Sequence, residues 1–389
     1  MNVLYIISAI LLCLLILETG LMYREWMRLQ KRYNQSPLTI RTFDGTDSPY
    51  HPSVIYFKEG WQGHKYYLAE TPFCCAYPDK GENYRDRFEC PSIHVSDDGI
   101  HWDETSPNPI DLLSEQEVTD RDYFSDPHLV YDGERMECWY RINHRHGDYE
   151  QHRHVCLLRK ISTDGVHWSN REILADLTQP GHPLGKMLVS PAILFRDGMY
   201  HMWYVDDICP GQRHIAYSCA SEPHSWNKAT VCTLNGYDVN PWHIDVSFID
   251  GIYRMIVFDR INLSLWESTD GISFEYVKSL LLPSRTIGSF YYRDLYRSCM
   301  IGTEQGYRVY FSANDTFKTS IGILEGPAPE ELGIVSIDEK PYCTFKQFFP
   351  KYTKLKTALA IGNTKRFLYL YGKRPIVEFL TRHNSSQRI

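Results

Sequence analysis

Several common signatures are missing from this chain of 389 residues, and each absence removes a class of function. Acidic residues outnumber basic ones, 48 to 41, so the chain lacks the positive excess that nucleic-acid binding requires. The 11 cysteines are odd in number, irregularly spaced and form no CxxC motif, which disfavours a disulfide framework and a zinc site. Cys138, Cys156 and Cys219 fall in expected strands and are interpreted as buried free thiols. We therefore expect no nucleic-acid partner, no metal and no cofactor.

Long hydrophobic runs are also rare, because the chain has only one, at its N-terminus. The run starts at Val3 and reaches Tyr23, a length of about 20 residues that can span a bilayer. No Lys or Arg precedes it and no small-x-small cleavage site follows, so a cleaved signal peptide is disfavoured. The basic residues between Arg24 and Arg32 predict a single-pass anchor with the remaining chain on the cytoplasmic side. An uncleaved secretory anchor is the alternative.

What the chain does have is one repeated pattern of short strands. Five times, an apolar strand is followed by a tight turn, a second strand, a loop, a third strand and a closing aromatic residue. The expected first strands are residues 52–57, 127–131, 191–196, 244–249 and 287–293. The closing aromatics are Trp102, Trp168, Trp226, Phe274 and Phe317. A period of roughly 40 to 50 residues built from short strands is typical of a β-propeller, so we predict an all-β, five-bladed propeller.

Turn chemistry supports the repeat independently. Asp-Gly pairs at 132–133, 197–198 and 250–251 separate first from second strands, and Asp-Gly supplies the positive φ angles of two-residue hairpins. A second type of turn, Ser-x-Asp-Gly followed by an aromatic residue, comes after the third strand. Its copies are at 96–102, 162–168 and 268–274. There the Asp can bond to its own turn while the aromatic packs between blades.

These patterns divide the chain into four segments. Residues 1–23 form the transmembrane anchor, residues 24–44 a stalk, and residues 45–325 the propeller. Residues 326–389 are a C-terminal extension whose later part is basic and partly amphipathic. Such a segment can pack on the last blade or lie on an anionic membrane surface. We expect the protein to be a monomer.

A propeller places a candidate site on its axis, where the starts of the inner strands and the ends of the second strands converge. Polar or aromatic residues occupy these positions. At the inner strand starts are His51, Asp126, Ser190, Trp242, His243 and Asp245. The second strands end with Arg141, Asp206, Asp207 and Asp259, and Glu89 precedes a third strand. Carboxylates sharing one pocket can be driven to different pKa values, so that one is an acid and another a base or nucleophile, as glycoside cleavage requires.

The Asp126-Pro127 entry, the Glu89-Cys90-Pro91 step and the Ser-x-Asp-Gly turns resemble those of five-bladed propeller glycoside hydrolases of the arabinanase, levansucrase and invertase superfamily. The resemblance covers roughly residues 45–320. It implies an Asp on the first inner strand as base or nucleophile, a second Asp that orients substrate or tunes a pKa, and a Glu as acid. Asp126 matches the Asp-Pro entries and Glu89 the Glu-Cys-Pro step. The first inner strand begins with His51, where this family has an Asp.

Three functions are compatible with this arrangement. The first is a membrane-anchored enzyme that hydrolyses or transfers glycosyl groups, with Asp126, Glu89 and Asp206 catalytic and the other axial residues binding a carbohydrate or glycolipid. The second is a non-catalytic glycan- or glycolipid-binding propeller, in which His51 marks the loss of hydrolysis. The third is a scaffold in envelope polysaccharide assembly, whose blade rims bind protein.

Overall fold

The computed structural model consists of two compact units. The larger comprises Gln35–Arg285 with Ser289–Lys340, and the smaller Met1–Asn34 with Thr286–Gly288 and Pro341–Ile389. The residues that the structure describes are 3–32, 35–73, 89–105, 107–120, 122–144, 154–177, 181–209, 212–286, 288–315, 318–337, 342–350 and 352–353. Phe317 and the basic segment from residue 354 onward therefore lie outside the described residues.

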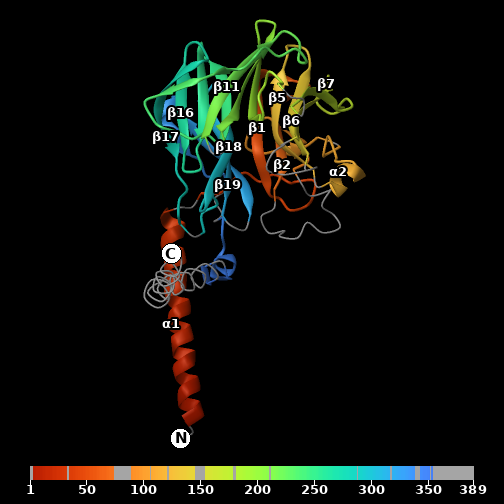
Figure 1. Cartoon of the computed structure of the whole chain (residues 1–389). Helices are drawn as coiled ribbons and strands as arrows, with labels where there is room; N and C mark the ends of the chain where they lie inside the picture. Colours follow the sequence, from red (N-terminus) through yellow and green to blue (C-terminus); the bar gives the residue numbers. More distant parts are fainter. Residues whose placement is uncertain are drawn as a thin grey trace, which may run out of the picture. The chain divides into compact units, whose positions relative to one another are not determined.

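Five sheets make up the larger unit, and each is one blade of the predicted propeller (Figure 1). The first blade contains β1 (Pro49–Trp61), β2 (His64–Pro72), β3 (Ser92–Ser96) and β4 (Asp103–Glu104). The second contains β5 (Tyr123–Tyr131), β6 (Met136–His144), β7 (His154–Ser162) and β8 (Glu172–Asp176). The third contains β9 (Val189–Arg196), β10 (Met199–Cys209), β11 (Gln212–Ala220) and β12 (Thr230–Val231).

The fourth and fifth blades complete the ring. The fourth contains β14 (His243–Ile249), β15 (Ile252–Phe258), β16 (Leu263–Ser268) and β17 (Ser273–Leu281), with β13 (Thr233–Asn235) parallel to β17. The fifth contains β18 (Asp294–Thr303), β19 (Gly306–Asn314), β20 (Thr319–Gly326) and β21 (Gly333–Ile334). Two short helical segments lie between strands, α2 (Glu115–Thr119) and η2 (Pro329–Glu331). The first strands touch in the order β1, β5, β9, β14, β18, and β18 returns to β1, which closes the propeller.

Hydrophobic clusters between neighbouring blades hold this ring together, and the four predicted closing aromatics that the structure describes lie in or against them. Trp226 is buried between the second and third blades, and Phe274 between the third and fourth. Trp168 packs against the cluster between the first and second blades, and Trp102 against the cluster that joins the fifth blade to the first. Eight cysteines of the described part of the chain are free thiols, and six of them are buried.

The Ser-x-Asp-Gly turns have the internal hydrogen bonds expected of them. In the second blade the Ser162 hydroxyl accepts from the Gly165 N–H at 2.8 Å. Asp164 Oδ1 accepts from the N–H groups of Val166 and His167 at 2.9 and 2.7 Å. The turns at Ser96 and Ser268 repeat these contacts. Sequence-local bonds of this kind are why the turns could be predicted without tertiary structure.

Substituting the turn glycine is a direct test of this packing. Gly165→Ala is expected to lower the free energy of unfolding by about 2–3 kcal/mol, since φ is +76° and a Cβ would lie 2.8 Å from Tyr67 Cε1. The control Gly198→Ala has φ +74° but nothing within 4 Å, so it should lose only about 1 kcal/mol. Urea unfolding midpoints measure both, and equal losses would show that the contact with Tyr67 contributes nothing.

The fifth blade starts one strand later than the sequence pattern predicts. Residues 287–293 are not a strand in their described part, and β18 begins at Asp294. The segments expected to be the second and third strands, 297–302 and 307–312, therefore lie in β18 and β19, the first and second strands of this blade. The misleading signal was apolar sequence, because Phe290 and Tyr291 are buried without being in a strand. Their rings pack on Phe311 of β19 at 5.9 and 6.5 Å.

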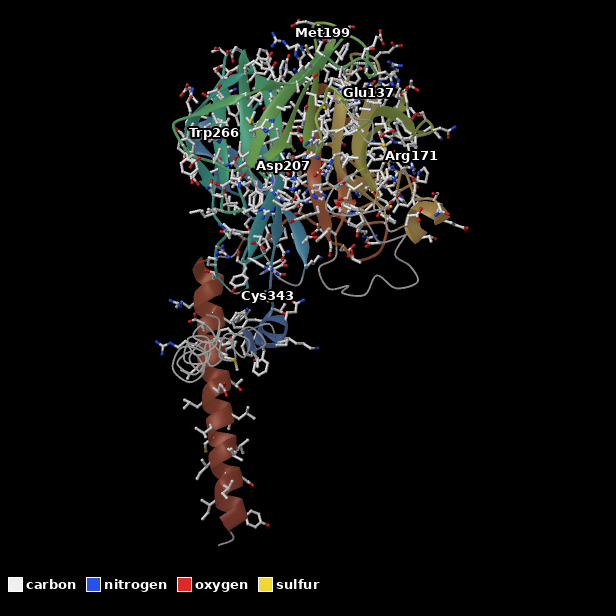
Figure 2. All side chains as sticks on the ribbon, in the orientation of Figure 1. Glu137, Arg171, Met199, Asp207, Trp266 and Cys343 are labelled. Atoms are coloured by element: carbon white, nitrogen blue, oxygen red, sulfur yellow. The ribbon has the colours of Figure 1, made fainter. Side chains whose placement is uncertain are left out.

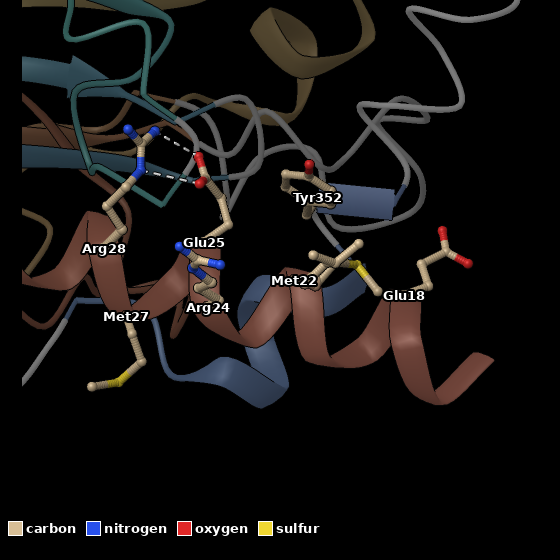
Figure 3. Close-up of a pocket in the computed structure, with 8 residues that line it drawn as sticks. Glu18, Met22, Arg24, Glu25, Met27, Arg28 and Tyr352 are labelled. Atoms are coloured by element: carbon tan, nitrogen blue, oxygen red, sulfur yellow. Dashed lines mark hydrogen bonds and ion pairs between the residues drawn. The ribbon is translucent and has the colours of Figure 1, made fainter. Parts of the chain in front are cut away.

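The smaller unit contains the predicted apolar helix, α1 (Val3–Arg32). Its portion Tyr5–Arg28 is long and apolar enough to cross a membrane, with a mean hydropathy of 2.2, features that an N-terminal signal sequence shares. Trp26 Nε1 donates to the Cys343 carbonyl at 2.8 Å, so the described C-terminal residues pack on this helix. A pocket beside them is lined by α1 side chains and Tyr352 (Figure 3).

Candidate functional site

The inner strands of three blades begin with the same irregularity. His51, Asp126 and Ser190 each precede a proline and have φ angles of 53, 54 and 54°. The strand register shifts beside each of them, as expected where Pro supplies no N–H to the ladder and a bulge forms. His243 at the start of β14 and Tyr296 in β18 take the corresponding places in the other two blades. We call these five residues the axial ring.

Asp126 is the anion of the axial ring. Its Oδ2 accepts from Arg141 Nε at 2.9 Å, from Arg141 Nη2 at 2.5 Å and from the Ser190 N–H at 3.1 Å. Its Oδ1 has no hydrogen-bond partner among the described residues. Burial by itself would raise the pKa of Asp126, but Arg141 and the other positive groups around the carboxylate hold that pKa far below its usual value. Asp126 is therefore ionised at any working pH, with one oxygen available.

Two imidazoles face the available oxygen of Asp126. His243 Nδ1 lies 3.5 Å and His51 Nε2 lies 3.9 Å from Oδ1. Burial lowers the pKa of His51 to about 4 and lowers that of His243 well below its ordinary value, so both rings are neutral at pH 7. His51 Nδ1 also lies 2.9 Å from the Thr71 hydroxyl and 3.7 Å from Glu89 Oε2. His51 thus connects the two predicted catalytic carboxylates.

A second layer of charged groups lies further along the same strands. Arg297 is 1% exposed, and its Nη2 donates to His128 Nδ1 at 3.1 Å and to the Pro191 carbonyl at 2.9 Å. Its Nη1 lies 3.8 Å from Asp126 Oδ1. Asp245 accepts from the Met300 N–H, and burial raises its pKa to about 7. Arg297 therefore interacts with a permanent anion, Asp126, and with an acid, Asp245, that is about half protonated at pH 7.

Three other predicted carboxylates are engaged in different ways. Asp206 accepts from the Met187 N–H at 2.8 Å, and the Met187 carbonyl in turn accepts from Arg141 at 3.3 Å, so Asp206 touches the ring only through this loop. Asp207, labelled in Figure 2, lies 3.6 Å from Arg213 Nε. Asp259 accepts from two N–H groups of its own turn. Substrate or catalytic roles for these three stay predictions.

Arg297, Tyr296 and Thr71 belong to the site but were not predicted from the sequence. Arg297 and Tyr296 were missed because the fifth blade was placed one strand too early, which put Arg297 at the start of the expected second strand, 297–302, and Tyr296 just before it. Thr71 stands next to the end of β2 and contacts His51. The only available signal was Arg297 itself, a charged residue within an apolar strand, Leu295 to Ile301. A charge at such a position is retained only if it is paired.

The buried histidines predict an acid-sensitive fold. Between about pH 4 and 6.5 the unfolded chain protonates His51, His128 and His243, whose folded pKa values are all lowered, His128 to about 3. Over the same range Asp245 is protonated in the folded chain, where its pKa is raised to about 7, but not in the unfolded chain. For these four groups unfolding takes up two net protons, and their contribution to stability should fall by about 3 kcal/mol per pH unit as the pH is lowered through this window.

Urea unfolding at half-unit steps from pH 4.5 to 7.5 measures this slope. Asp245→Asn removes the opposing contribution of this carboxyl group and should make the slope steeper by about half, or about 1.4 kcal/mol per pH unit. His101→Gln is the control, because that imidazole is exposed on the surface. A flat profile, or an unchanged slope in Asp245→Asn, would contradict the assignment of these protonation states.

Within the described residues, no three His, Cys, Asp or Glu side chains converge to hold a metal ion.

Comparisons with known proteins agree with this architecture, although no protein-family model matches the chain. The A type blood N-acetyl-alpha-D-galactosamine deacetylase of Flavonifractor plautii is 26% identical over 326 residues, which are 69% of this chain and 40% of that protein. This chain therefore spans about two fifths of the length of its relative.

Solved structures show the same fold. An N-acetylgalactosamine deacetylase from F. plautii, in complex with blood group B trisaccharide, matches with a TM-score of 0.61 at 22% identity, over 75% of this chain and 94% of that one. The sucrose-6-phosphate hydrolase of Lactobacillus gasseri matches with a TM-score of 0.54 at 14% identity, over 81% and 67%. The five-bladed propeller and its likeness to propeller glycoside hydrolases are thereby confirmed.

Proposed function

We propose that this chain is a carbohydrate-active hydrolase that binds a glycan at the axial ring and cleaves one of its bonds there. The main support is a set of buried polar atoms without hydrogen-bond partners among the described residues: Asp126 Oδ1, both His243 nitrogens and Arg297 Nη1. Leaving such an atom unpaired costs about 1–3 kcal/mol, a cost that calls for a functional explanation. The likeness to a glycan-modifying enzyme supports the substrate class.

The reaction that fits the ring best is removal of an N-acyl group from an amino sugar. His51 is neutral, so its Nε2 can take a proton from a water molecule whose oxygen then adds to the amide carbonyl. The imidazolium that forms has the Asp126 carboxylate 3.9 Å from the same Nε2, and the negative charge of that carboxylate stabilises it. When the C–N bond breaks, the same proton passes to the leaving amine, and the products are a carboxylic acid and a free amino sugar.

Glycosyl cleavage or transfer is the second candidate, with Asp126 and Glu89 as the pair of carboxylates and Asp206 in support. The contacts of both Asp126 and Glu89 with His51 favour it, because the two carboxylates face the two nitrogens of one imidazole. Asp126, held ionised, suits the base or nucleophile of such a pair, and Glu89 would be the acid. The imidazole of His51 stands where an ordinary member of the superfamily has a carboxylate, so we rank this reaction second.

The two candidates differ in their products. A panel of N-acetylated oligosaccharides is incubated with the protein, and free acetate with a new amine indicates deacylation, whereas a new reducing end indicates glycosyl cleavage. His51→Ala should abolish deacylation, and Glu89→Gln should abolish glycosyl cleavage; the surface variant His101→Ala should change neither. Glycan binding without any turnover, kept in Glu89→Gln and lost in His51→Ala, would instead support a non-catalytic binding propeller. If the protein neither binds nor turns over any of these glycans, the proposal is refuted.

We further propose that α1 is an uncleaved membrane anchor and that the propeller faces the cytoplasm. The proposal is supported by the span Tyr5–Arg28, by the basic residues near its end and by the free thiols of the propeller. Full-length protein should stay with membranes after carbonate washing, and a variant lacking residues 1–34 should not. Protease digestion of intact cells or spheroplasts that removed the propeller would refute the orientation.

A further inference from the structure

Beside the axial ring, two guanidinium groups share one indole. Trp242 immediately precedes His243, and its Nε1 donates to the Tyr296 hydroxyl at 3.1 Å. The Arg213 Cζ lies 4.1 Å from the centroid of the Trp242 ring and the Arg260 Cζ lies 4.2 Å from it. The indole is therefore in contact with two cations, and a sugar ring would have to compete with them to stack there.

These contacts are at the end of the propeller where the inner strands start. Arg213 follows the β10–β11 loop and Arg260 follows the end of β15, which are the loops that surround the starts of the inner strands. Phe258, at the end of β15, contacts the Tyr296 ring at 5.7 Å, and Tyr296 contacts the His243 ring at 4.0 Å. One indole thus separates the two guanidinium groups from the residues that face Asp126.

The two arginines differ in their counter-ions. Arg213 has the Asp207 carboxylate at 3.6 Å, whereas among the described residues no carboxylate lies within ion-pair distance of Arg260, which is exposed. The neighbouring Asp259 accepts from the N–H groups of Ile261 and Asn262. Arg260 also has φ 73°, a conformation that costs a residue with a side chain about 1–2 kcal/mol.

A cation on an indole stabilises a protein by about 0.5–1 kcal/mol at an exposed site, so blade packing alone could explain one of the two arginines. It does not explain a second like charge on the same ring, since the two repel one another. This feature is explained if an anion completes the arrangement. Guanidinium groups bind carboxylate, sulfate and phosphate through paired N–H donors, and both are already oriented by the indole.

We propose that the axial site takes glycans carrying an anionic substituent, and that Arg213 and Arg260 bind this substituent next to the reacting group. The inference rests on the proposed carbohydrate function and names the substrate class of that site. A uronate carboxylate and a sugar sulfate share the required chemistry, a planar or tetrahedral group of anionic oxygens. The bond that is cleaved stays at the axial ring, so the two arginines determine specificity and are not catalytic.

The test uses three matched N-acetylated oligosaccharides that differ in one neighbouring sugar, which is galactose, 6-sulfated galactose or galacturonate. With wild-type protein, KM should be about tenfold lower for the anionic forms than for the neutral one, with little difference in kcat. Arg260→Gln and Arg213→Gln should remove this preference. Raising NaCl from 0.05 to 0.5 M should weaken it in the wild type, because salt screens the attraction. A difference confined to one anionic form would identify which oxygen geometry the site accepts.

Arg196→Gln is the matched control. Arg196 also lies on aromatic rings, with its Cζ 3.7 Å from the Phe248 centroid, but it stands at the Asp197-Gly198 hairpin, the opposite end of its blade. This variant should keep the full preference for anionic sugars. Equal KM values for neutral and anionic forms in the wild type, or an unchanged preference in Arg260→Gln, would overturn the inference while leaving the proposed hydrolase intact.

A failure of the proposed function gives a different result. If wild-type protein turns over none of the three oligosaccharides, their binding is measured by calorimetry instead. Tighter binding of the sulfated form, lost in Arg260→Gln and kept in Arg196→Gln, would support the anion site on a binding protein. No difference in binding between sulfated and neutral forms would overturn it.

Discussion

Asp126→Asn should lower turnover at the axial site by about 10³- to 10⁴-fold, the size of effect seen when the carboxylate that orients a catalytic histidine is replaced by its amide. The amide can still accept one bond from Arg141, but it presents an uncharged group to His51 and His243. A developing imidazolium on His51 then loses the carboxylate that faces its Nε2 and keeps only Glu89, 3.7 Å from its Nδ1. The same change leaves Arg141 and Arg297 buried without their shared counter-ion, so stability should also fall, by about 3–5 kcal/mol.

Because the variant is destabilised, its activity is expressed per folded molecule, with near-UV circular dichroism at 10 °C giving the folded fraction. Asp132→Asn is the control: Asp132 pairs with Arg135 on a surface hairpin, and its loss should leave kcat unchanged. Glycan binding measured alongside separates a lost chemical step from a lost site. Turnover by folded Asp126→Asn within tenfold of wild type would exclude Asp126 from the reaction under either candidate chemistry.

Arg297→Met should destabilise the propeller by about 3–5 kcal/mol, as expected when one partner of a buried ion pair is removed. The side chain is fully buried, and its loss leaves the His128 nitrogen and the Pro191 carbonyl without a donor. Asp126 keeps only Arg141 as a directly paired cation. Asp245, with its pKa already near 7, becomes fully protonated, so the loss of Arg297 leaves no unpaired negative charge on Asp245.

A double-mutant cycle distinguishes this ion pair from simple loss of packing. Asp126→Asn combined with Arg297→Met should cost less than the sum of the single changes, by about 1–3 kcal/mol, because no charge is then left unpaired on Asp126 or Arg297. Arg254→Met is the control, since Arg254 is similarly buried but pairs with the partly exposed Glu267, and it should cost about 1 kcal/mol. Additive losses in the cycle would mean that Arg297 acts through packing alone.

Much of the fold could be predicted because its signals are local. The Asp-Gly hairpins and Ser-x-Asp-Gly turns satisfy their own hydrogen bonds within a few residues, as the Ser162 turn does. The repeat then follows from counting these turns. Asp126 could be predicted in the same way, because the Asp-Pro step that marks it also produces the bulge at which it stands.

The fifth blade shows where such reasoning stops. Phe290 and Tyr291 have the apolar character of an inner strand, yet they are packed against β19 from a turn. Placing the blade one strand early moved Tyr296 and Arg297 out of the predicted site. Nothing in the local sequence distinguishes an apolar strand from an apolar turn that another strand covers.

The sequence by itself determined the repeat, the turns and the position of Asp126 at the start of an inner strand, since all three depend on residues close together in the chain. Only the tertiary structure decided that His51 and His243 face the same carboxylate oxygen, that Arg297 is its buried counter-charge, and that two arginines meet on Trp242. Those contacts join different blades. They exist because the propeller closes, and closure sets the register of every inner strand, where an offset of one residue would turn each side chain away from its partner.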